Sequence, residues 1–467
     1  MANKNLLTTQ AKTIQVEQVY FSPVAVLPSA TDTPFGTMYC FLAKVDSWAD
    51  DNNPEQPRGD ISYLKQVFKN MFATKLIRAS DVSPVIKRID WTTGTTYDYF
   101  QDTVDMSEKD ANGYPVYNFY VKNKYDQVFK CLWNNNGGAS TEEPYFEPGS
   151  YGTNGIFNKS VEDGGDGYKW KFMFTVDTGL KTKFMDDTWM PVQVGQNTPN
   201  PLQTSAGAGS IDAINITDNG LGYDATLPIT VTITGDGTGA AGQAVANSQG
   251  FITDVLVTNA GSDYTFATVS ITSSQGSGAT AIAPTSPIGG HGFDPISELG
   301  CDKIMITCEF NGTENGVLPV DLDYHQVGIV TVPQTVSGGF YTPANGEIYR
   351  TTTDIVVASG FGTFVEDEYV YQGRSLAEAM ADPANNFYAK VVYFNPSTNV
   401  LYVINKVGTL VENSPIFGDT SATTRTILSS SISDFVPFSG YISYIENRSR
   451  ILRSEDGIEQ FRFVLGY

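Results

Sequence analysis

Histidine is the side chain best suited to acid–base catalysis near neutral pH, and the 467-residue sequence contains two, His291 and His325. His291 lies in the glycine-rich stretch Gly289–Gly292, where it could orient a turn through hydrogen bonds. His325 follows Asp321 and Asp323, with which it could pair electrostatically. A catalytic triad could include either histidine, but the sequence has no G-x-S-x-G nucleophile elbow. We therefore expect neither histidine to be catalytic.

A glycine-rich stretch could cradle a phosphate group. Residues 237–242, Gly-Thr-Gly-Ala-Ala-Gly, match the pattern G-x-G-x-x-G. A dinucleotide site also needs this turn to open a helix whose N-terminal amides meet the pyrophosphate. The stretch that follows, residues 243–250, is too short and too polar for that helix. We therefore expect a structural turn and no cofactor.

Paired carboxylates could hydrolyse a glycosidic bond if they faced each other across a cleft. The adjacent acidic pairs are Asp50–Asp51, Glu142–Glu143 and Asp186–Asp187. Adjacency in sequence does not place two carboxylates across a cleft, so we expect these pairs to lie in solvated loops. The stretch Asp163–Asp166 superficially resembles a calcium loop, but it lacks the alternating ligands and terminal glutamate of an EF-hand. A tight turn is the simpler prediction.

The four cysteines, Cys40, Cys131, Cys301 and Cys308, are widely separated and have no C-x-x-C spacing. This pattern argues against both a disulfide scaffold and a zinc site. Cys308 would share one face of a strand with Ile304, Ile306 and Phe310, as a small core residue does. We therefore predict no catalytic, cofactor-binding or metal-binding residues.

Aromatic side chains exposed on a sheet could bind sugar rings. The best candidates are Tyr223 and Tyr264, which recur at equivalent positions of an internal repeat. Recurrence also fits a shared packing role, and we expect packing. The sugar-binding alternative would make the chain a carbohydrate-binding module.

Composition limits the classes of partner. Asp and Glu number 51 against 29 for Lys and Arg, which gives a net charge of −22. The sequence has no Lys or Arg between Lys183 and Lys303, whereas nucleic-acid binding requires clustered cations. This distribution argues against nucleic acid and anionic membranes as partners. Residues 1–10 lack the apolar core of a signal peptide, so we expect synthesis in the cytoplasm.

High contents of Gly, Pro, Tyr and Phe with few charged residues predict short strands and many turns. One amphipathic helix is predicted from Asp60, its N-cap, to Ile77. Residues 168–176 alternate aromatic side chains with Lys169 and Lys171, which predicts a half-buried strand. The turn Asn395–Asn399 is expected to close a hairpin within a compact, barrel-like module.

Residues 200–288 contain an internal repeat and no Lys, Arg or Glu. The segment 211–220 matches 252–261, and 231–234 matches 269–272. Two β units of about 41 residues, packed on each other, are therefore predicted to form a small inserted module.

Several segments outside residues 200–288 and 336–430 resemble the baseplate wedge subunit of T-even-type contractile-tailed phages, in the form found in phages of cyanobacteria with two extra insertions. The resemblance is distributed along the chain and is closest near its C-terminal end. The segments that carry it are Trp48–Pro57, Val85–Trp91 with Tyr97 and Tyr99, Val128–Leu132, Asp166–Phe174, Gln326–Val330, Ser439–Arg448 and Glu459.

The resemblance implies Greek-key β-sandwich domains, a homodimer and a structural role in the virion beside other wedge proteins. It carries no catalytic residues, and it implies neither a small-molecule substrate nor a cofactor. A carbohydrate-binding tail module and a tail-associated glycoside hydrolase are the alternatives.

Together these patterns predict a mainly β, multidomain chain with a short helix and two inserted small β modules. The predicted division has four parts. They are a discontinuous core domain (1–84, 289–335 and 431–467), a second β-sandwich (85–199), the repeat module (200–288) and the barrel-like module (336–430).

Overall fold

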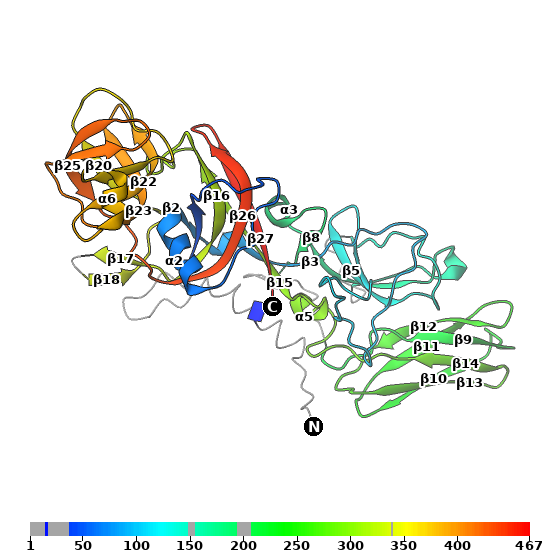
Figure 1. Ribbon diagram of the computed structural model, residues 1–467. Coiled ribbons are helices and arrows are strands. Elements are labelled where there is room, and N and C mark those ends of the chain that lie inside the picture. Colours follow the sequence, from blue (N-terminus) through cyan, green and yellow to red (C-terminus); the bar gives the residue numbers. More distant parts are fainter. Residues whose placement is uncertain (1–14, 17–36, 148–154, 194–206, 338–339) are drawn as a thin grey trace. The chain divides into compact units, whose positions relative to one another are not determined.

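The computed structural model confirms a mainly β chain with short helices and several antiparallel sheets (Figure 1). The chain forms two compact units, and the finer division into four domains stays a prediction. The first unit comprises residues 1–18, 83–305 and 464–467, and the second comprises 19–82 and 306–463. The structure describes residues 15–16, 37–147, 155–193, 207–337 and 340–467, so the segment 1–10 lies outside the described residues.

The second unit is built around a five-stranded antiparallel sheet. Its strands, in spatial order, are β19 (Ile348–Arg350), β2 (Met71–Ile77), β1 (Met38–Ala43), β16 (Leu322–Thr331) and β26 (Tyr441–Arg453). Strand β16 pairs with β1 on one side and β26 on the other, and nine of its ten residues are buried, so both of its faces are covered. The centre of the sheet therefore joins segments that are hundreds of residues apart in sequence.

The predicted helix is shorter than its apolar periodicity suggested. Helix α2 (Ile61–Asn70) begins at the expected N-cap, where the Asp60 carboxylate accepts a hydrogen bond from the backbone N–H of Tyr63. The prediction that the helix reaches Ile77 is wrong, because the chain turns into strand β2 at Met71. Pairing of β2 with β1 on one side and β19 on the other overrides the local helical pattern.

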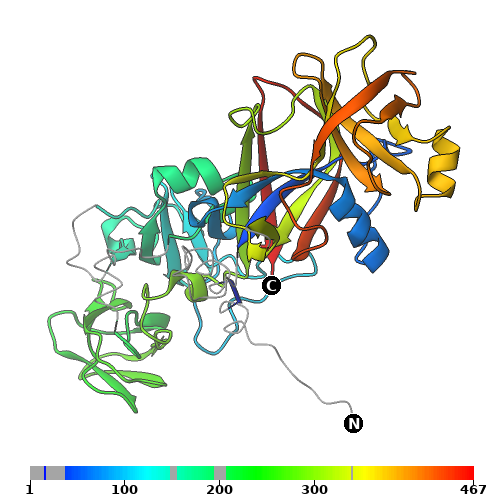
Figure 2. The ribbon, with the colours of Figure 1, turned by 90° about the vertical axis from the view of Figure 1, so that its left-hand side faces the viewer.

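The second unit also contains a closed six-stranded barrel, which confirms the barrel-like prediction. Its strands, in order around the barrel, are β20 (Thr353–Val357), β23 (Val400–Val407), β22 (Phe387–Asn395), β21 (Tyr369–Gln372), β24 (Pro415–Gly418) and β25 (Thr424–Ser431). Strands β22 and β23 form the expected antiparallel hairpin. Helix α6 (Leu376–Ala381) lies against the outside of the barrel (Figure 2). The inward-facing residues form a core of their own, which includes Ile355, Val391 and Leu401.

Further elements complete the second unit. They are the 3₁₀ turn η2 (Ala79–Asp81), most of the strands β15 (Lys303–Asn311) and β27 (Ile458–Gly466), which lie side by side, and the hairpin of β17 (Gln334–Ser337) and β18 (Phe340–Pro343). Cys308 is buried on β15 beside Cys40 of β1, as expected of a small core residue.

The first unit contains a four-stranded antiparallel sheet with an aromatic core. Its strands, in order, are β4 (Tyr120–Lys122), β5 (Gln127–Trp133), β7 (Lys169–Thr175) and β6 (Ile156–Asn158). Trp170 is fully buried and stacks on Tyr168. The unit also includes β3 (Val82–Lys87) paired with β8 (Trp189–Pro191), η3 (Val161–Asp163), α3 (Thr178–Phe184) and α5 (Pro295–Glu298).

The prediction that β7 is half-buried is wrong, because both of its faces are covered. The aromatic residues face the core, while Lys169 and Lys171 are 6% and 3% exposed on the opposite face. This second face is covered by carboxylates from residues 212–298, which alternation along one strand cannot reveal.

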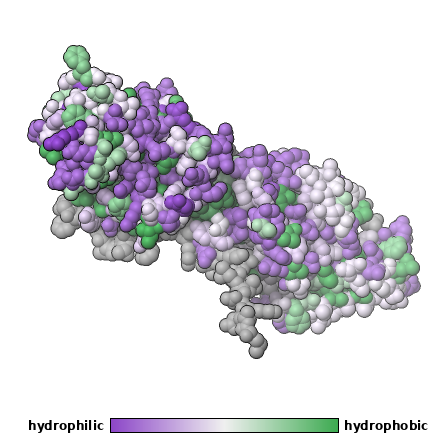
Figure 3. Space-filling view, viewed as in Figure 1, coloured by the Kyte–Doolittle hydropathy of each residue, from purple (hydrophilic) through white to green (hydrophobic). Residues whose placement is uncertain are grey.

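The two copies of the repeat are interlocked by strand pairing, beyond the simple packing that the sequence predicted. Copy one supplies β9 (Asn215–Leu221), β10 (Ile229–Gly235) and β11 (Ala241–Ala246), and copy two supplies β12 (Ile252–Asn259), β13 (Ala267–Ser273) and β14 (Ser277–Ile282). The last strand of each copy pairs with the first strand of the other, and the two middle strands pair with each other. The surface of this module is largely of intermediate hydropathy, as its Thr, Ser and Gly content requires (Figure 3).

Two glycines occupy equivalent positions in the two repeat copies, and we expect alanine at either position to destabilise the module. Gly220 and Gly261 have φ values of +60° and +63°, and an added Cβ would lie 2.4 and 2.5 Å from a backbone nitrogen. The matched control is Gly239→Ala, which has a similarly positive φ but no atom closer than 3.7 Å to the added carbon. The control should cost about 1–2 kcal/mol of unfolding free energy, and Gly261→Ala more than twice that, measured by thermal unfolding. Equal losses would mean that the close approach does not constrain this turn.

Candidate functional site

His291 lies in an enclosed structural cluster of the first unit. Its side chain is 2% exposed, its ring meets that of Phe100 edge-on at 5.0 Å, and its Nδ1 lies 3.8 Å from Glu298 Oε2. Burial, helped by the neighbouring Lys130 charge, lowers the pKa of His291 from 6.5 to about 4. The imidazole is therefore neutral at pH 7.

This lowered pKa predicts a pH-dependent stability. The folded protein binds fewer protons at His291 than the unfolded chain between pH 4 and 6.5, so its contribution is complete above pH 6.5 and is lost as the pH falls toward 4. The full shift corresponds to about 3 kcal/mol. We expect His291→Gln to flatten the rise of unfolding free energy over this window, measured by urea unfolding at successive pH values. If the unfolding free energy of the variant rose with pH as steeply as that of the wild type, another titrating group would be responsible for the pH dependence.

The second histidine has different neighbours from those expected. His325 is buried on β16, where its Nε2 lies 3.6 Å from Asp51 Oδ1 and its ring faces Trp48 edge-on at 6.4 Å. It is not paired with Asp321 or Asp323, and the Asp323 carboxylate instead binds Lys44 and Arg450. The two histidines lie in different units.

The repeat tyrosines are packing residues. Tyr223 and Tyr264 are 3% and 6% exposed. The Tyr223 hydroxyl accepts a hydrogen bond from Ala279 N, and the Tyr264 hydroxyl accepts one from Ala240 N. Each tyrosine therefore holds the other copy of the repeat. They offer no exposed platform for a sugar ring.

The other candidate motifs also have structural roles. Residues 237–240 belong to the turn between β10 and β11, and Ala241 and Gly242 begin β11, so a strand follows where a dinucleotide site needs a helix. Glu143 pairs with Lys124 at 2.8 Å, and the Asp186 carboxylate accepts hydrogen bonds from two backbone amides. Asp166 is buried and accepts from Ser140 Oγ and from three backbone amides, which fixes the predicted turn.

A group of buried charges lies on the covered face of the sheet in the first unit. Lys130 of β5 stands directly opposite Lys171 of β7 in the sheet register, and both are buried. Burial lowers the pKa of each ammonium group, and the proximity of the other lysine lowers the pKa of Lys130 further. Two carboxylates oppose this effect, because Glu298 forms an ion pair with Lys130 and Asp212 lies 3.7 Å from Lys171.

A neighbouring ion pair extends the same lysine face. Lys169 Nζ lies 2.8 Å from Asp254 Oδ1 in the second repeat copy. The repeat module and helix α5 are thus attached to the sheet through buried charges, in addition to apolar contacts.

The second unit contains a cluster of three carboxylates that could hold a metal ion. Oxygen atoms of Asp323, Glu366 and Asp367 lie within 4.8 Å of one another. The fully buried Lys44 ammonium occupies their centre: it lies 2.5 Å from Asp323 Oδ1 and 3.3 Å from Asp367 Oδ2, and it also binds Glu366. Arg450 also binds Asp323, and Lys390 also binds Asp367, so three cations balance the three carboxylates. The cluster joins the central sheet to the barrel, and it fits an ion-pair joint better than a metal site.

Segments at opposite ends of the chain meet beside the central sheet. Trp48 Nε1 donates a hydrogen bond to the carbonyl of Arg448 at 2.8 Å. Asn447 Nδ2 donates to the carbonyl of Glu55 at 2.7 Å, and Gln326 Nε2 donates to Asn447 Oδ1 at 2.7 Å. The loop 48–55 is therefore fixed along strand β26.

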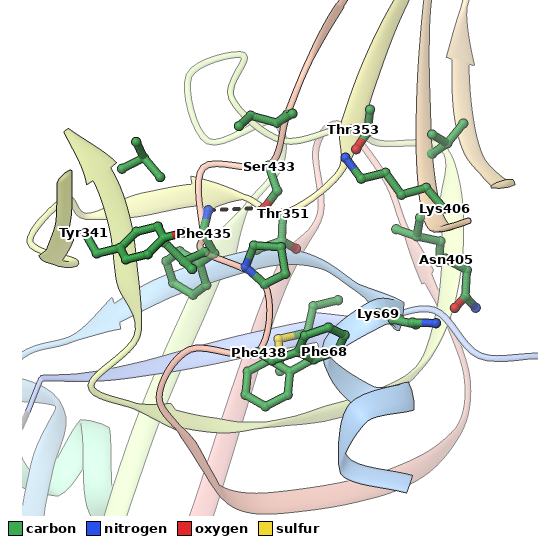
Figure 4. Close-up of a pocket in the computed structure, with 17 residues that line it drawn as sticks. Phe68, Lys69, Tyr341, Thr351, Thr353, Asn405, Lys406, Ser433, Phe435 and Phe438 are labelled. Atoms are coloured by element: carbon green, nitrogen blue, oxygen red, sulfur yellow. Dashed lines mark hydrogen bonds between the residues drawn. The ribbon is translucent and has the colours of Figure 1, made fainter. Parts of the chain in front are cut away.

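A cavity with a mostly apolar lining lies in the second unit, between helix α2, the barrel strand β23 and the hairpin β17–β18 (Figure 4). Its volume is about 420 Å³. Aromatic rings from separate segments, Phe68, Tyr341, Phe435 and Phe438, surround it.

Sequence reasoning identified neither the buried lysines nor this cavity. The two lysines at alternate positions of an aromatic strand are a possible signal of buried ion pairs. The same pattern is equally consistent with a strand face that is exposed to solvent. The cavity has no local signal, because its residues come together only through the sheet and barrel.

Among the helices of the described part of the chain, none has the length and apolar character needed to cross a membrane. Comparison of the sequence with family models and with curated proteins found no match.

Proposed function

We propose that this chain is a structural subunit of the baseplate wedge of a contractile phage tail and acts without catalysis. In this proposal it is made in the host cytoplasm, forms a homodimer and binds other wedge proteins in the virion.

The observation that carries the proposal is the position of the segments that resemble the wedge subunit. In the second unit, Trp48 and the loop that follows it are hydrogen-bonded to Asn447 and Arg448, about 400 residues away. Gln326–Val330 belongs to β16, the strand that pairs with β26. Within the second unit, segments that are weak signals separately thus form one connected framework, and the barrel is an addition to it.

The charged clusters support a scaffolding role. Lys44, Lys130 and Lys169 are each neutralised by carboxylates within their own unit. Removing one partner from such a buried pair is strongly destabilising, so these groups favour a fixed geometry. A subunit that holds its neighbours in place needs rigid domains and complementary surfaces.

Two experiments test this role. The purified chain should scatter light as a species of twice its 50.8 kDa mass. Phage in which the gene is disrupted should accumulate incomplete tails that the intact gene restores. A monomer together with normal tails in the disrupted phage would contradict the proposal.

A further inference from the structure

The apolar cavity of the second unit has a rigid frame. Asn405 of β23 donates a hydrogen bond from Nδ2 to Asn70 Oδ1 at the end of α2, at 2.7 Å, which holds the barrel beside the helix. The inner wall is apolar and includes Met71 and Phe435, which are 1% and 6% exposed. A volume of about 420 Å³ is large enough for several side chains or one small ligand.

The mouth of this cavity is lined by large apolar side chains that remain in contact with solvent. Tyr341 and Ile432 are 70% and 69% exposed, and Val336 and Phe438 are about half exposed. Single exposed apolar residues are ordinary, but a group of four around one cavity is typical of a binding surface. Because the group extends beyond the enclosed volume, it fits a chain segment better than a compact small molecule.

The charge of the lining differs from that of the whole chain. None of the 17 described residues that line the cavity is acidic, whereas two are lysines, Lys69 and Lys406. Across the chain, acidic residues outnumber basic ones by 51 to 29. Within the described residues neither lysine forms an ion pair, and partial burial lowers the pKa of Lys406. In Figure 4 the Lys406 side chain extends toward Thr353.

The wall also contains an unsatisfied polar group. The hydroxyl of Thr351 is buried and has no hydrogen-bond partner among the described residues. A bound backbone or carboxylate group could supply one, as buried polar atoms require.

We propose that this groove binds an extended segment of a partner protein that carries large apolar side chains and an acidic residue. The apolar side chains would enter the cavity lined by Phe68 and Phe435, and the carboxylate would lie between Lys69 and Lys406. This inference rests on the proposed wedge function and names the chemistry of one partner contact. Apolar anchors supply most of the affinity of such a contact, and the charges supply specificity.

The test uses the purified full chain and two fluorescein-labelled peptides, one of repeated Leu-Glu-Phe and one of repeated Leu-Lys-Phe. Fluorescence anisotropy should show that the wild type binds the acidic peptide more tightly. The double variant Lys69→Glu/Lys406→Glu should weaken that binding by about tenfold or more and should prefer the basic peptide. Tyr341→Ser should weaken binding of both peptides. Lys65→Glu is the matched control, since this exposed residue lies on the same helix but outside the cavity.

Three outcomes would overturn the inference. Equal binding of both peptides, or no exchange of preference in the double variant, would exclude charge recognition. Binding of decanoate without binding of either peptide would make the groove a small-amphiphile site. Self-association of the wild type that Tyr341→Ser abolishes would make it a contact between copies of the chain. All three are measured on the isolated chain, so they are distinguishable from failure of the wedge proposal, which would appear as absence of the chain from virions.

Discussion

Replacing Glu298 by glutamine is expected to lower the unfolding free energy of the first unit by about 3–5 kcal/mol. Glutamine keeps the size of the side chain and an oxygen that can accept from Gly292 N, to which Glu298 Oε1 is bound at 2.7 Å. It removes the negative charge that neutralises Lys130, which is buried opposite Lys171. The measurement is the urea midpoint of the variant against the wild type at pH 7.

The control for this experiment is Glu143→Gln, which removes the carboxylate partner of Lys124, a side chain that is 63% exposed. Exposed pairs contribute up to about 1 kcal/mol, so the control should shift the midpoint only slightly. Equal effects of the two substitutions would mean that Lys130 is neutral in the folded protein. Burial lowers the pKa of Lys130 and therefore favours this neutral form.

Replacing Lys44 by serine is expected to destabilise the second unit by a similar amount, about 3–5 kcal/mol. The substitution leaves Asp323, Glu366 and Asp367 together without their central cation. Three carboxylates around a vacated space provide the oxygen ligands that calcium prefers. Added calcium chloride should therefore raise the melting temperature of the variant, because a ligand that binds only the folded state stabilises it.

The wild type should show no such response, since the Lys44 ammonium occupies the centre of the cluster. Sodium chloride at matched ionic strength is the control, because it screens charges to the same extent without supplying calcium. A calcium response in the wild type would show that the cluster is a metal site. A response of the variant equal to that in sodium chloride would show that the carboxylates do not converge on one ion.

Local sequence patterns predicted the elements whose signals lie within a single segment. The two matching segments 211–220 and 252–261 predicted a module of two β units, and the Asn395–Asn399 turn predicted the β22–β23 hairpin. Asp60 was correctly predicted as an N-cap, because capping depends on residues only a few positions away.

Features that depend on long-range pairing could not be predicted in this way. The helical pattern continues past Asn70, yet Met71–Ile77 is a strand because β1 and β19 need a partner between them. The ion pairs of Lys169 with Asp254 and of Lys130 with Glu298 join residues far apart in sequence. The same limit applies to the groove, whose rings come from α2, β18 and residues 435–438.

The proposal that the chain is a wedge subunit is tested most directly by counting it in purified virions. Quantitative mass spectrometry of intact particles, with sheath and tube proteins as internal standards, gives the number of copies per tail. The account predicts a fixed copy number set by the six-fold symmetry of the baseplate. Absence of the chain from virions, or a trace amount that varies between preparations, would contradict it and would favour a carbohydrate-binding or enzymatic role.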